Sequence, residues 1–404
     1  MFRKLIPVFY FLIVLALLVS ACTTATPVGT PGAPTEPVLE ALPTDVLPEL
    51  GADTPAVEAT SEGAQPGAAD TPAPAPPGTG AAQPAGFGEI VNRIQSRGRI
   101  ICGSRTDLPG FGFLDESGRN MGFDVDFCRA IAAALLDDPE AIEVVPLSAA
   151  ERGPALQTGE VDVLSRTATW TSSRDAQWGN FTWVTFYDGQ GFMVPADTGI
   201  TSIEELNGAT VCVTSGTTTE LNLADAFRQR DLEFEPLVFE DTASVYGAYE
   251  EGRCDAATSD VSQLAGVRSG FADPEAHTIL DITISKEPLT PAVPTGDSQW
   301  FDIVKVVIWG LINAEEFGVT QANVDEMITG ENVEVRRLLG AEGEWGQADL
   351  GLPADAIAKA IRAVGNYGEV YDRYMGPEGM SFTLDRGLND LWTNGGLIYG
   401  IPLR

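Results

Sequence analysis

Residues 156–174 read Leu-Gln-Thr-Gly-Glu-Val-Asp-Val-Leu-Ser-Arg-Thr-Ala-Thr-Trp-Thr-Ser-Ser-Arg, and the fold can be worked out from this stretch. Its apolar centre, 161–164, is short and rich in valine, which is typical of a buried strand. A helix is predicted over 149–158, although the helix breakers Gly153 and Pro154 could shorten it. The strand ends in a run of hydroxyls and arginines, so polar chemistry is expected at its carboxyl end.

The residues before this stretch repeat the same alternation. Predicted strands at 99–102 and 142–147 flank a predicted helix over 123–136, with Asp124 near its expected N-cap. Strand–helix–strand–helix–strand predicts a parallel sheet covered by helices.

A second unit of the same kind begins near Ile200. Extended, glycine- or proline-punctuated passages at 186–194 and 288–294 lead into it and out of it. The chain is therefore expected to enter a second lobe and return, with two crossovers. The predicted helices of this unit are 201–206, 220–228 and 242–251, and its predicted strands are 210–213, 236–240 and 255–258.

The predicted fold class is thus α/β, with two lobes of parallel-rich sheets joined by two crossover strands. Lobe 1 is expected to comprise 88–188 and, after the return, 291–404, with lobe 2 at 189–290. Helical patterns in the return segment cover 300–316, 355–368 and 384–392.

The N-terminus predicts export. Arg3 and Lys4 precede an apolar run over 5–19, which is short for a membrane span, and small residues follow. Residues 1–21 are therefore expected to be a signal peptide; the alternative is a retained membrane anchor. Val-Ser-Ala-Cys at 19–22 resembles a lipobox, which implies lipid on Cys22. Residues 22–87 are rich in Pro, Ala and Thr and are expected to be a disordered linker.

Composition excludes several classes of protein. The net charge is -34, which disfavours nucleic acid and anionic surfaces as partners and suits a well-solvated monomer. The single histidine and the absence of Cys-x-x-Cys give no support to a metal site, and no cofactor is expected.

The four cysteines other than Cys22 form an even number suited to two disulfides in an oxidising compartment. Keeping each bond inside one lobe selects Cys102–Cys128 and Cys212–Cys254, and buried free thiols are the alternative.

Ligands of open parallel sheets bind at the carboxyl ends of the strands. Arg166 and Arg174 follow one strand amid hydroxyls, and an arginine fork suits a carboxylate, although a surface ion pair would also fit Arg174. Residues 215–220 form a donor-rich turn into a helix, without the lysine of a phosphate loop. Asp260 follows a lobe 2 strand and could accept from an ammonium group or cap the next helix.

Several stretches resemble the general L-amino-acid-binding proteins of polar amino-acid ABC transporters (extracellular solute-binding protein family 3). The likeness covers essentially all of 88–404. The stretches are Gly-Phe-Asp-Val-Asp-Phe-Cys-Arg-Ala at 122–130, residues 156–166, Tyr-Asp-Gly-Gln-Gly-Phe at 187–192, Gly-Thr-Thr-Thr-Glu-Leu-Asn-Leu-Ala-Asp at 216–225 and Val-Gly-Asn-Tyr-Gly-Glu at 364–369.

The resemblance implies a type II periplasmic-binding fold and a site for a free L-amino acid. Arg174 matches the arginine that grips the α-carboxylate, and Asp260 matches the α-ammonium acceptor. The remaining ligand contacts that it implies are Thr167, Thr169, Thr217 and Thr218, with Arg166 at a position that bears on selectivity and Phe111 as the aromatic residue over the ligand.

The implied function is amino-acid capture outside the cytoplasm by closure of the two lobes, with delivery to the permease of an ABC importer. The protein would be held at the membrane through its lipid. An enzyme of the cyclohexadienyl-dehydratase type on the same fold is the alternative, but no histidine or other poised acid lies near the site motifs. A sensory receptor is not expected, because the sequence shows no kinase-like region.

Overall fold

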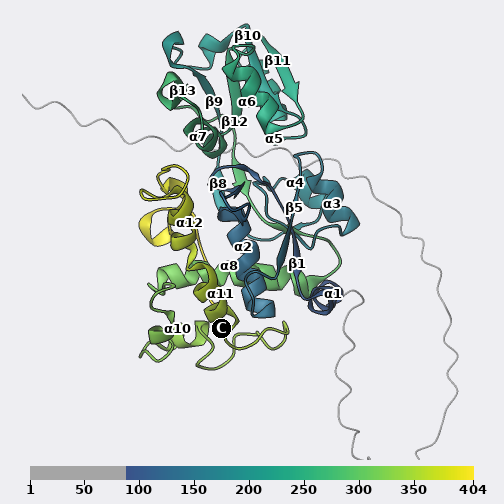
Figure 1. The fold of residues 1–404 in the computed structure, drawn as a ribbon, viewed down its shortest axis with the longest axis vertical. Coiled ribbons are helices and arrows are strands. Elements are labelled where there is room, and N and C mark those ends of the chain that lie inside the picture. Colours follow the sequence, from purple (N-terminus) through teal and green to yellow (C-terminus); the bar gives the residue numbers. More distant parts are fainter. Residues whose placement is uncertain (1–87) are drawn as a thin grey trace, which may run out of the picture. The chain divides into compact units, whose positions relative to one another are not determined.

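The structure, a computed structural model, describes residues 88–404. The predicted signal peptide, the lipid-bearing Cys22 and the linker lie outside the described residues. Two separate five-stranded sheets organise the described part of the chain (Figure 1). We call the body around the first sheet lobe 1 and the body around the second sheet lobe 2.

The sheet of lobe 1 has the strand order β5-β1-β6-β15-β7. Strand β1 pairs in parallel with β5 and β6, whereas β15 pairs antiparallel with β6 and β7. A small antiparallel sheet, β2-β3-β4, precedes α2. The strands are β1 (Ile100–Ser104), β2 (Asp107–Leu108), β3 (Gly112–Leu114), β4 (Asn120–Met121), β5 (Ile142–Pro146), β6 (Val163–Leu164), β7 (Asn180–Phe181) and β15 (Ala292–Val293).

The helices of lobe 1 come from both ends of the described chain. Helices α2, α8 and α11 pack on one another, although α2 is far from the other two in sequence (Figure 1). The helices are α1 (Glu89–Arg97), α2 (Phe123–Leu136), α3 (Arg152–Thr158), α4 (Ser172–Gln177), α8 (Ser298–Glu316), α9 (Val324–Met327), α10 (Val333–Leu338), α11 (Ala356–Val364) and α12 (Tyr367–Met375), with 3-10 turns at Gly387–Asn389 and Trp392–Asn394.

Lobe 2 repeats this order as β11-β10-β12-β9-β13, with β10, β11 and β12 parallel and β9 and β13 antiparallel. The strands are β9 (Gln190–Pro195), β10 (Ala209–Thr214), β11 (Phe234–Phe239), β12 (Ala256–Asp260) and β13 (His277–Ile279). The helices are α5 (Thr218–Arg228), α6 (Thr242–Glu250) and α7 (Val261–Ser269), with 3-10 turns at Ala196–Thr198, Glu204–Leu206 and Pro274–Ala276.

Two short strands carry the chain between the lobes. β8 (Phe186–Asp188) leads out of lobe 1, and β14 (Glu287–Leu289) leads back. They pair antiparallel with Asp188 opposite Glu287. The described residues thus contain two crossovers between the lobes, as predicted. Strands β8 and β14 form a two-stranded sheet of their own. The exact residue at which each lobe begins and ends stays a prediction.

Three secondary-structure predictions were wrong in detail. The helix predicted over 355–368 is two helices, because Gly365 has a φ of 85° and Asn366 then starts α12 with a capping box. The helical pattern at 384–392 yields only 3-10 turns, and 201–206 yields one such turn at Glu204–Leu206.

The breakers Gly153 and Pro154 lie in the first turn of α3, which starts only at Arg152. Proline is tolerated there because the first-turn amides have no partner within the helix. Gly153 faces a tryptophan: a Cβ on it would lie 2.6 Å from Nε1 of Trp178. The helix is therefore short, as expected, and the glycine lets it lie close to that ring.

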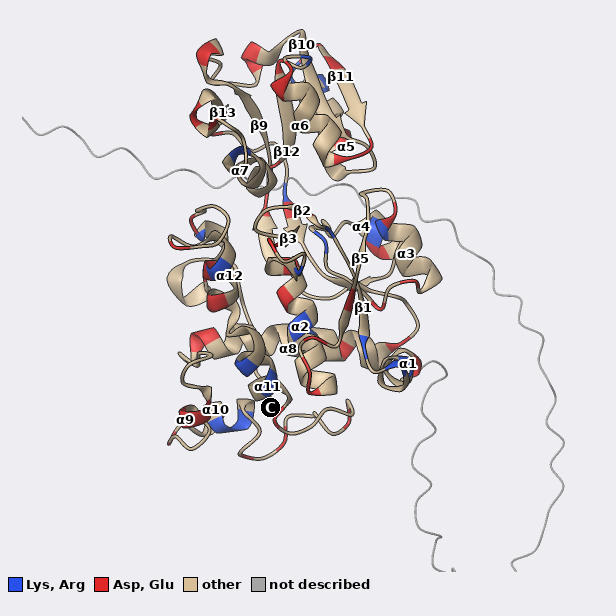
Figure 2. Cartoon of the chain, in the orientation of Figure 1, with Lys and Arg blue, Asp and Glu red and all other residues tan. Residues whose placement is uncertain are grey.

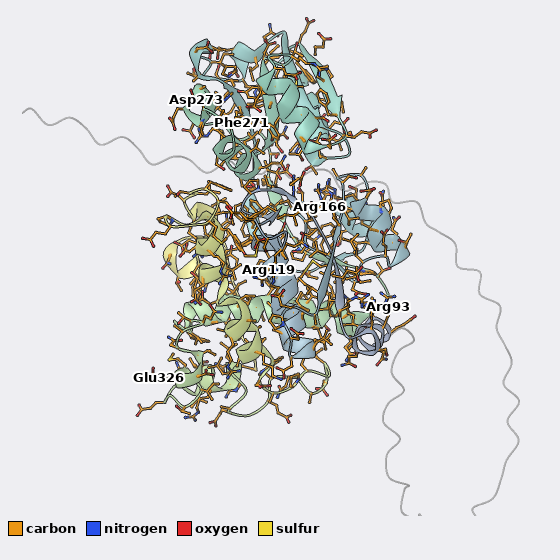
Figure 3. The ribbon with its side chains drawn as sticks, in the orientation of Figure 1. Arg93, Arg119, Arg166, Phe271, Asp273 and Glu326 are labelled. Carbon is orange, nitrogen blue, oxygen red and sulfur yellow. A yellow bond between two sulfur atoms is a disulfide. The ribbon has the colours of Figure 1, made fainter. Side chains whose placement is uncertain are left out.

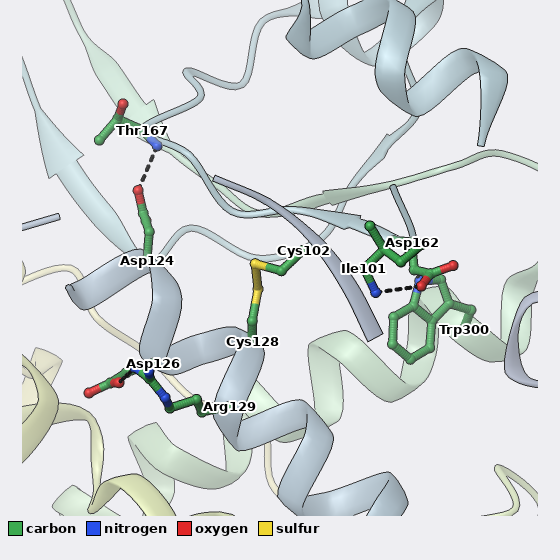
Figure 4. The surroundings of a disulfide bond; sticks show 9 residues. All are labelled: Ile101, Cys102, Asp124, Asp126, Cys128, Arg129, Asp162, Thr167 and Trp300. Carbon is green, nitrogen blue, oxygen red and sulfur yellow. Dashed lines mark hydrogen bonds and ion pairs between the residues drawn. A yellow bond between two sulfur atoms is a disulfide. The ribbon is translucent and has the colours of Figure 1, made fainter. Parts of the chain in front are cut away.

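Both disulfides join the predicted partners inside single lobes. Cys102 of β1 bonds to Cys128 of α2 in lobe 1 (Figure 4), and Cys212 of β10 bonds to Cys254 in lobe 2. Neither bond connects the lobes, so neither restrains their relative movement.

Candidate functional site

A pocket of about 30 Å³ lies between the two lobes. Its wall is almost wholly polar and combines hydroxyls, an amide, three arginines and one aspartate. Arg166, labelled in Figure 3, belongs to this wall. The lining residues are Arg105, Ala149, Arg152, Arg166, Thr167, Thr169, Thr214, Thr217, Thr218, Thr219, Thr242, Ser259, Asp260 and Gln263.

The arginines of the pocket are a local cluster of positive charge in a protein that is acidic as a whole. Asp and Glu are spread over elements of both lobes (Figure 2), and the net charge is -34. Burial, reinforced by Arg105, lowers the pKa of Arg166 to about 9. Burial also lowers the pKa of Arg152, and Arg166 and Arg174 add to that effect. Clustered buried cations repel one another, so this wall favours an anionic group of a ligand.

Arg105 joins the two lobes. It follows β1 in lobe 1, where its Nε donates to Asp107 Oδ1 at 2.7 Å. Its terminal nitrogens reach lobe 2, donating to Gln263 Oε1 at 2.8 Å and to Thr242 Oγ1 at 3.0 Å. These hydrogen bonds connect the two lobes at the part of the pocket wall that Arg105 lines.

Thr167 is held from three sides. Its φ of 36° is strained for a β-branched residue. Its amide donates to Asp124 Oδ2 at 2.7 Å (Figure 4), its carbonyl accepts from Arg152 at 3.2 Å, and its hydroxyl lies 3.4 Å from Arg105 Nη1. The surroundings thus fix a backbone conformation that the loop alone would disfavour.

Asp124 has a different role from the one predicted. The N-cap of α2 is Gly122, and no side chain caps the helix. Asp124 instead accepts from the Thr167 amide across the lobe, and burial raises the pKa of this carboxyl to about 6. The aspartate therefore positions the pocket loop.

Arg174 adjoins the pocket without belonging to its lining. It lies in α4, with its guanidinium 4.6 Å from the centre of the Trp178 ring. Its Nη1 donates to the Thr169 carbonyl at 3.1 Å. Burial lowers its pKa, and Glu287 and Asp260 oppose that shift. The arginine is thus buried directly behind Thr169, close to the acidic side of the site, and is not a surface ion pair.

On the lobe 2 wall, two neighbouring threonines have different partners. Thr217 is the N-cap of α5: its hydroxyl accepts from the Glu220 amide at 3.1 Å and donates to the Thr214 carbonyl at 2.7 Å. Thr218 lies opposite lobe 1, with its Oγ1 3.3 Å from that of Thr169. Only the second hydroxyl makes contact across the lobes.

Asp260 ends β12 and is buried in the pocket wall. Its Oδ1 has no hydrogen-bond partner, and although Asp260 is the N-cap residue of α7, its side chain makes no capping hydrogen bond. Burial raises its pKa well above the ordinary value, and Asp188 and Glu287 raise it further. A buried carboxylate without a donor is costly, so the site favours a cation at this position.

Phe111 does not reach the pocket, which corrects its predicted role. The ring is 1% exposed and packs edge-on against Phe123 and Phe186 in the lobe 1 core. A side chain held there cannot cover a ligand between the lobes.

The predicted site residues did not include Arg105, Arg152, Thr242 and Gln263, which line the pocket. Arg105 directly follows the first strand, so the carboxyl-end rule could have found it. The other three lie on helices, and no local signal distinguished them.

A second, larger cavity of about 250 Å³ opens beside the first. The two share Arg105, Ala149, Arg166, Thr214 and Thr242. Because the two spaces adjoin, a ligand anchored in the small pocket has room to extend into the larger cavity. The lining of the larger cavity includes further acidic and polar residues.

Among the residues that the structure describes, no group of His, Cys, Asp and Glu is suited to hold a metal ion. Within the same residues, no helix has the length and apolar character that a membrane crossing requires.

Comparisons with known proteins identify the family. The family model of the bacterial extracellular solute-binding proteins, family 3, matches residues 100–377. The general L-amino acid-binding periplasmic protein AapJ of Rhizobium johnstonii is 51% identical over 316 residues, which cover 78% of this chain and 92% of that protein. The glutamate/glutamine/aspartate/asparagine-binding protein BztA of Rhodobacter capsulatus is 46% identical over 78% of this chain and 93% of its own length.

Solved structures match as well. A periplasmic binding protein of an ABC transporter from Brucella ovis, with glutathione bound, has a TM-score of 0.76 and 48% identity, covering 78% of this chain and 99% of its own. The cysteine-binding protein of Campylobacter jejuni has a TM-score of 0.51 and 26% identity, covering 61% and 96%. The predicted two-lobed periplasmic-binding fold and the predicted family are confirmed: the chain belongs to the bacterial extracellular solute-binding proteins of family 3.

Proposed function

We propose that this chain captures free L-amino acids between its lobes and delivers them to an ABC importer. The relatives that match over most of the chain are named as amino-acid-binding proteins, and one is named as a general binder. Each is named for binding, which favours a receptor over an enzyme.

One observation carries the proposal: a single small pocket holds an unpartnered buried carboxylate and a cluster of buried arginines. A free amino acid carries both an ammonium and a carboxylate. Asp260 would accept from the ammonium, and the arginine side would hold the carboxylate. Charged hydrogen bonds of this kind are each worth about 1.5–3 kcal/mol net.

The carboxylate partner is proposed to be Arg174, supported by the backbone of the Thr167–Thr169 loop. Arg105, Arg152 and Arg166, unlike Arg174, belong to the pocket lining itself. Because Arg166 also lines the larger cavity, we propose that it contacts the ligand side chain instead. A hinge at β8 and β14 would let lobe 2 close on a ligand that lobe 1 binds first.

Thermal-shift screening of the twenty L-amino acids, followed by calorimetry, tests this function, because a ligand that binds the native state raises the melting temperature. The variants Arg174→Ala, Arg152→Ala and Arg166→Ala then separate the roles. Loss of affinity for every amino acid marks the α-carboxylate partner, and a changed order among amino acids marks the side-chain contact. Absence of binding to all twenty by the folded wild-type protein would refute the proposal.

We further propose that the mature protein is held outside the cytoplasm by lipid on Cys22, because a lipobox-like tetrapeptide follows a basic and apolar leader. In a bacterial host, Cys22→Ser should move the protein from the membrane fraction to the soluble extracytoplasmic fraction. Unchanged fractionation together with no lipid on the wild-type protein would exclude the anchor.

A further inference from the structure

Glu287 lies at the point where the two lobes and the crossover strands meet. It belongs to β14, is 1% exposed, and does not line the pocket. Its carboxylate accepts four hydrogen bonds. Oε2 accepts from Thr169 at 2.6 Å and Thr218 at 2.8 Å, and Oε1 accepts from Asn222 at 2.8 Å and Ser285 at 2.5 Å.

The two partners of Oε2 come from opposite lobes. Thr169 belongs to lobe 1, and Thr218 begins α5 of lobe 2. Both threonines also line the pocket. One carboxylate oxygen therefore connects the two walls of the pocket from behind.

The hydroxyl protons of Thr169 and Thr218 determine whether these groups can donate or accept hydrogen bonds in the pocket. Each threonine hydroxyl has one proton and two lone pairs. Both protons point to Glu287, so neither hydroxyl has one left for the other, although their oxygens lie 3.3 Å apart. Each oxygen can then only accept from a group in the pocket.

We propose that Glu287 is a positioning residue that turns Thr169 and Thr218 into acceptors for the ammonium group of the ligand. Together with Asp260, they would surround the ammonium with oxygens from both lobes. Binding of the ammonium would thereby favour closure. This gives a specific role to two residues that the resemblance implies as ligand contacts, and it rests on the proposed function.

The test compares L-glutamate with glutarate, which lacks the amino group but keeps both carboxylates. Dissociation constants are measured by calorimetry for wild type, Glu287→Gln, Thr218→Val and Thr218→Ser. A glutamine cannot accept from all four donors, and valine removes an acceptor without changing the shape of the side chain. Both should weaken L-glutamate binding by about 10- to 100-fold, the loss of a charge-assisted contact, and change glutarate binding by less than about threefold.

Thr218→Ser and one further variant, Asn222→Ala, make the result specific. Thr218→Ser keeps the hydroxyl and should restore most of the preference for L-glutamate over glutarate. Asn222→Ala removes a partner of Oε1 only and should leave that preference unchanged.

The inference is overturned if folded Glu287→Gln and Thr218→Val keep the wild-type preference, or if they weaken both ligands equally, as a purely structural contact between the lobes would. Circular dichroism and melting temperature establish that each variant is folded. Failure of wild type to bind any amino acid would instead refute the proposed function, so the two failures can be told apart.

Discussion

Replacing Asp260 by asparagine should separate binding from stability. The carboxylate is buried and its Oδ1 has no partner, so its charge is costly without a ligand. Asparagine has nearly the same shape but no charge. We expect the free energy of unfolding of the ligand-free protein to rise near neutral pH, because the amide carries no charge; the gain is about 1.4 kcal/mol for each pKa unit by which burial raises the pKa of this carboxyl. For a chain of this size, that raises the melting temperature by about 2–4 °C per kcal/mol.

The same substitution should weaken amino-acid binding by about 2–5 kcal/mol, because it leaves the ligand ammonium in a buried site without its counter-charge. The dissociation constant would rise by about 30-fold to several thousand-fold. Differential scanning fluorimetry with and without ligand measures the stability change, and calorimetry measures the affinity.

Asp126→Asn is the matched control. Asp126 is equally buried, but it accepts from Arg129 at 2.9 Å, Arg373 at 2.6 Å and Tyr374 at 2.9 Å, away from the pocket. Its replacement should lower stability and leave affinity unchanged. The reasoning fails if Asp260→Asn binds within a few-fold of wild type, or if it is less stable than wild type without ligand.

Three further outcomes follow from the geometry. Burial raises the pKa of Asp188 to about 6 and that of Asp260 well above its ordinary value. Because both carboxyls hold their protons more tightly in the folded state, the stability of the ligand-free protein should fall as pH rises from about 4 through the raised pKa. Amino-acid affinity should rise over the same pH range, because the ionised carboxylate binds the ammonium group. Calorimetry and melting curves from pH 5 to 8 check both signs, and flat profiles would contradict them. Gly153→Ala should lower the free energy of unfolding by about 1–3 kcal/mol and change the fluorescence of Trp178, because a Cβ would lie 2.6 Å from Nε1 of that ring; an unchanged melting curve would show that the ring moves freely. Arg174→Lys should lose at least about tenfold in affinity despite keeping the charge, because lysine lacks the planar fork and cannot stack on Trp178 in the same way; wild-type affinity would contradict this.

The sequence predicted those parts of the site that follow from local pattern. Apolar segments locate the strands, and the residues after the strands then include Arg166, Thr167, Thr169 and Asp260, all of which line the pocket. Disulfide partners also follow, because a bond within one lobe is the choice that leaves the hinge free.

Contacts between distant segments could not be predicted in this way. Phe111 lies in the turn between β2 and β3, and its ring is buried because Phe123 and Phe186, from a helix and a crossover strand, pack around it. Glu287 showed no local signal either, because three of its four donors, Thr169, Thr218 and Asn222, are 65 or more residues away in the sequence. Only Ser285 is a near neighbour. The position of such groups depends on how the lobes meet, which periodicity does not encode.

The placement of the two disulfides bears on how the protein is assembled after export. Each bond closes a loop within one lobe, with sequence separations of 26 and 42 residues, and should contribute about 3–4 kcal/mol to the lobe that contains it. Because oxidation in one half requires nothing from the other, either half could mature first. A reductant would then lower the stability of both lobes without changing how the lobes move relative to each other.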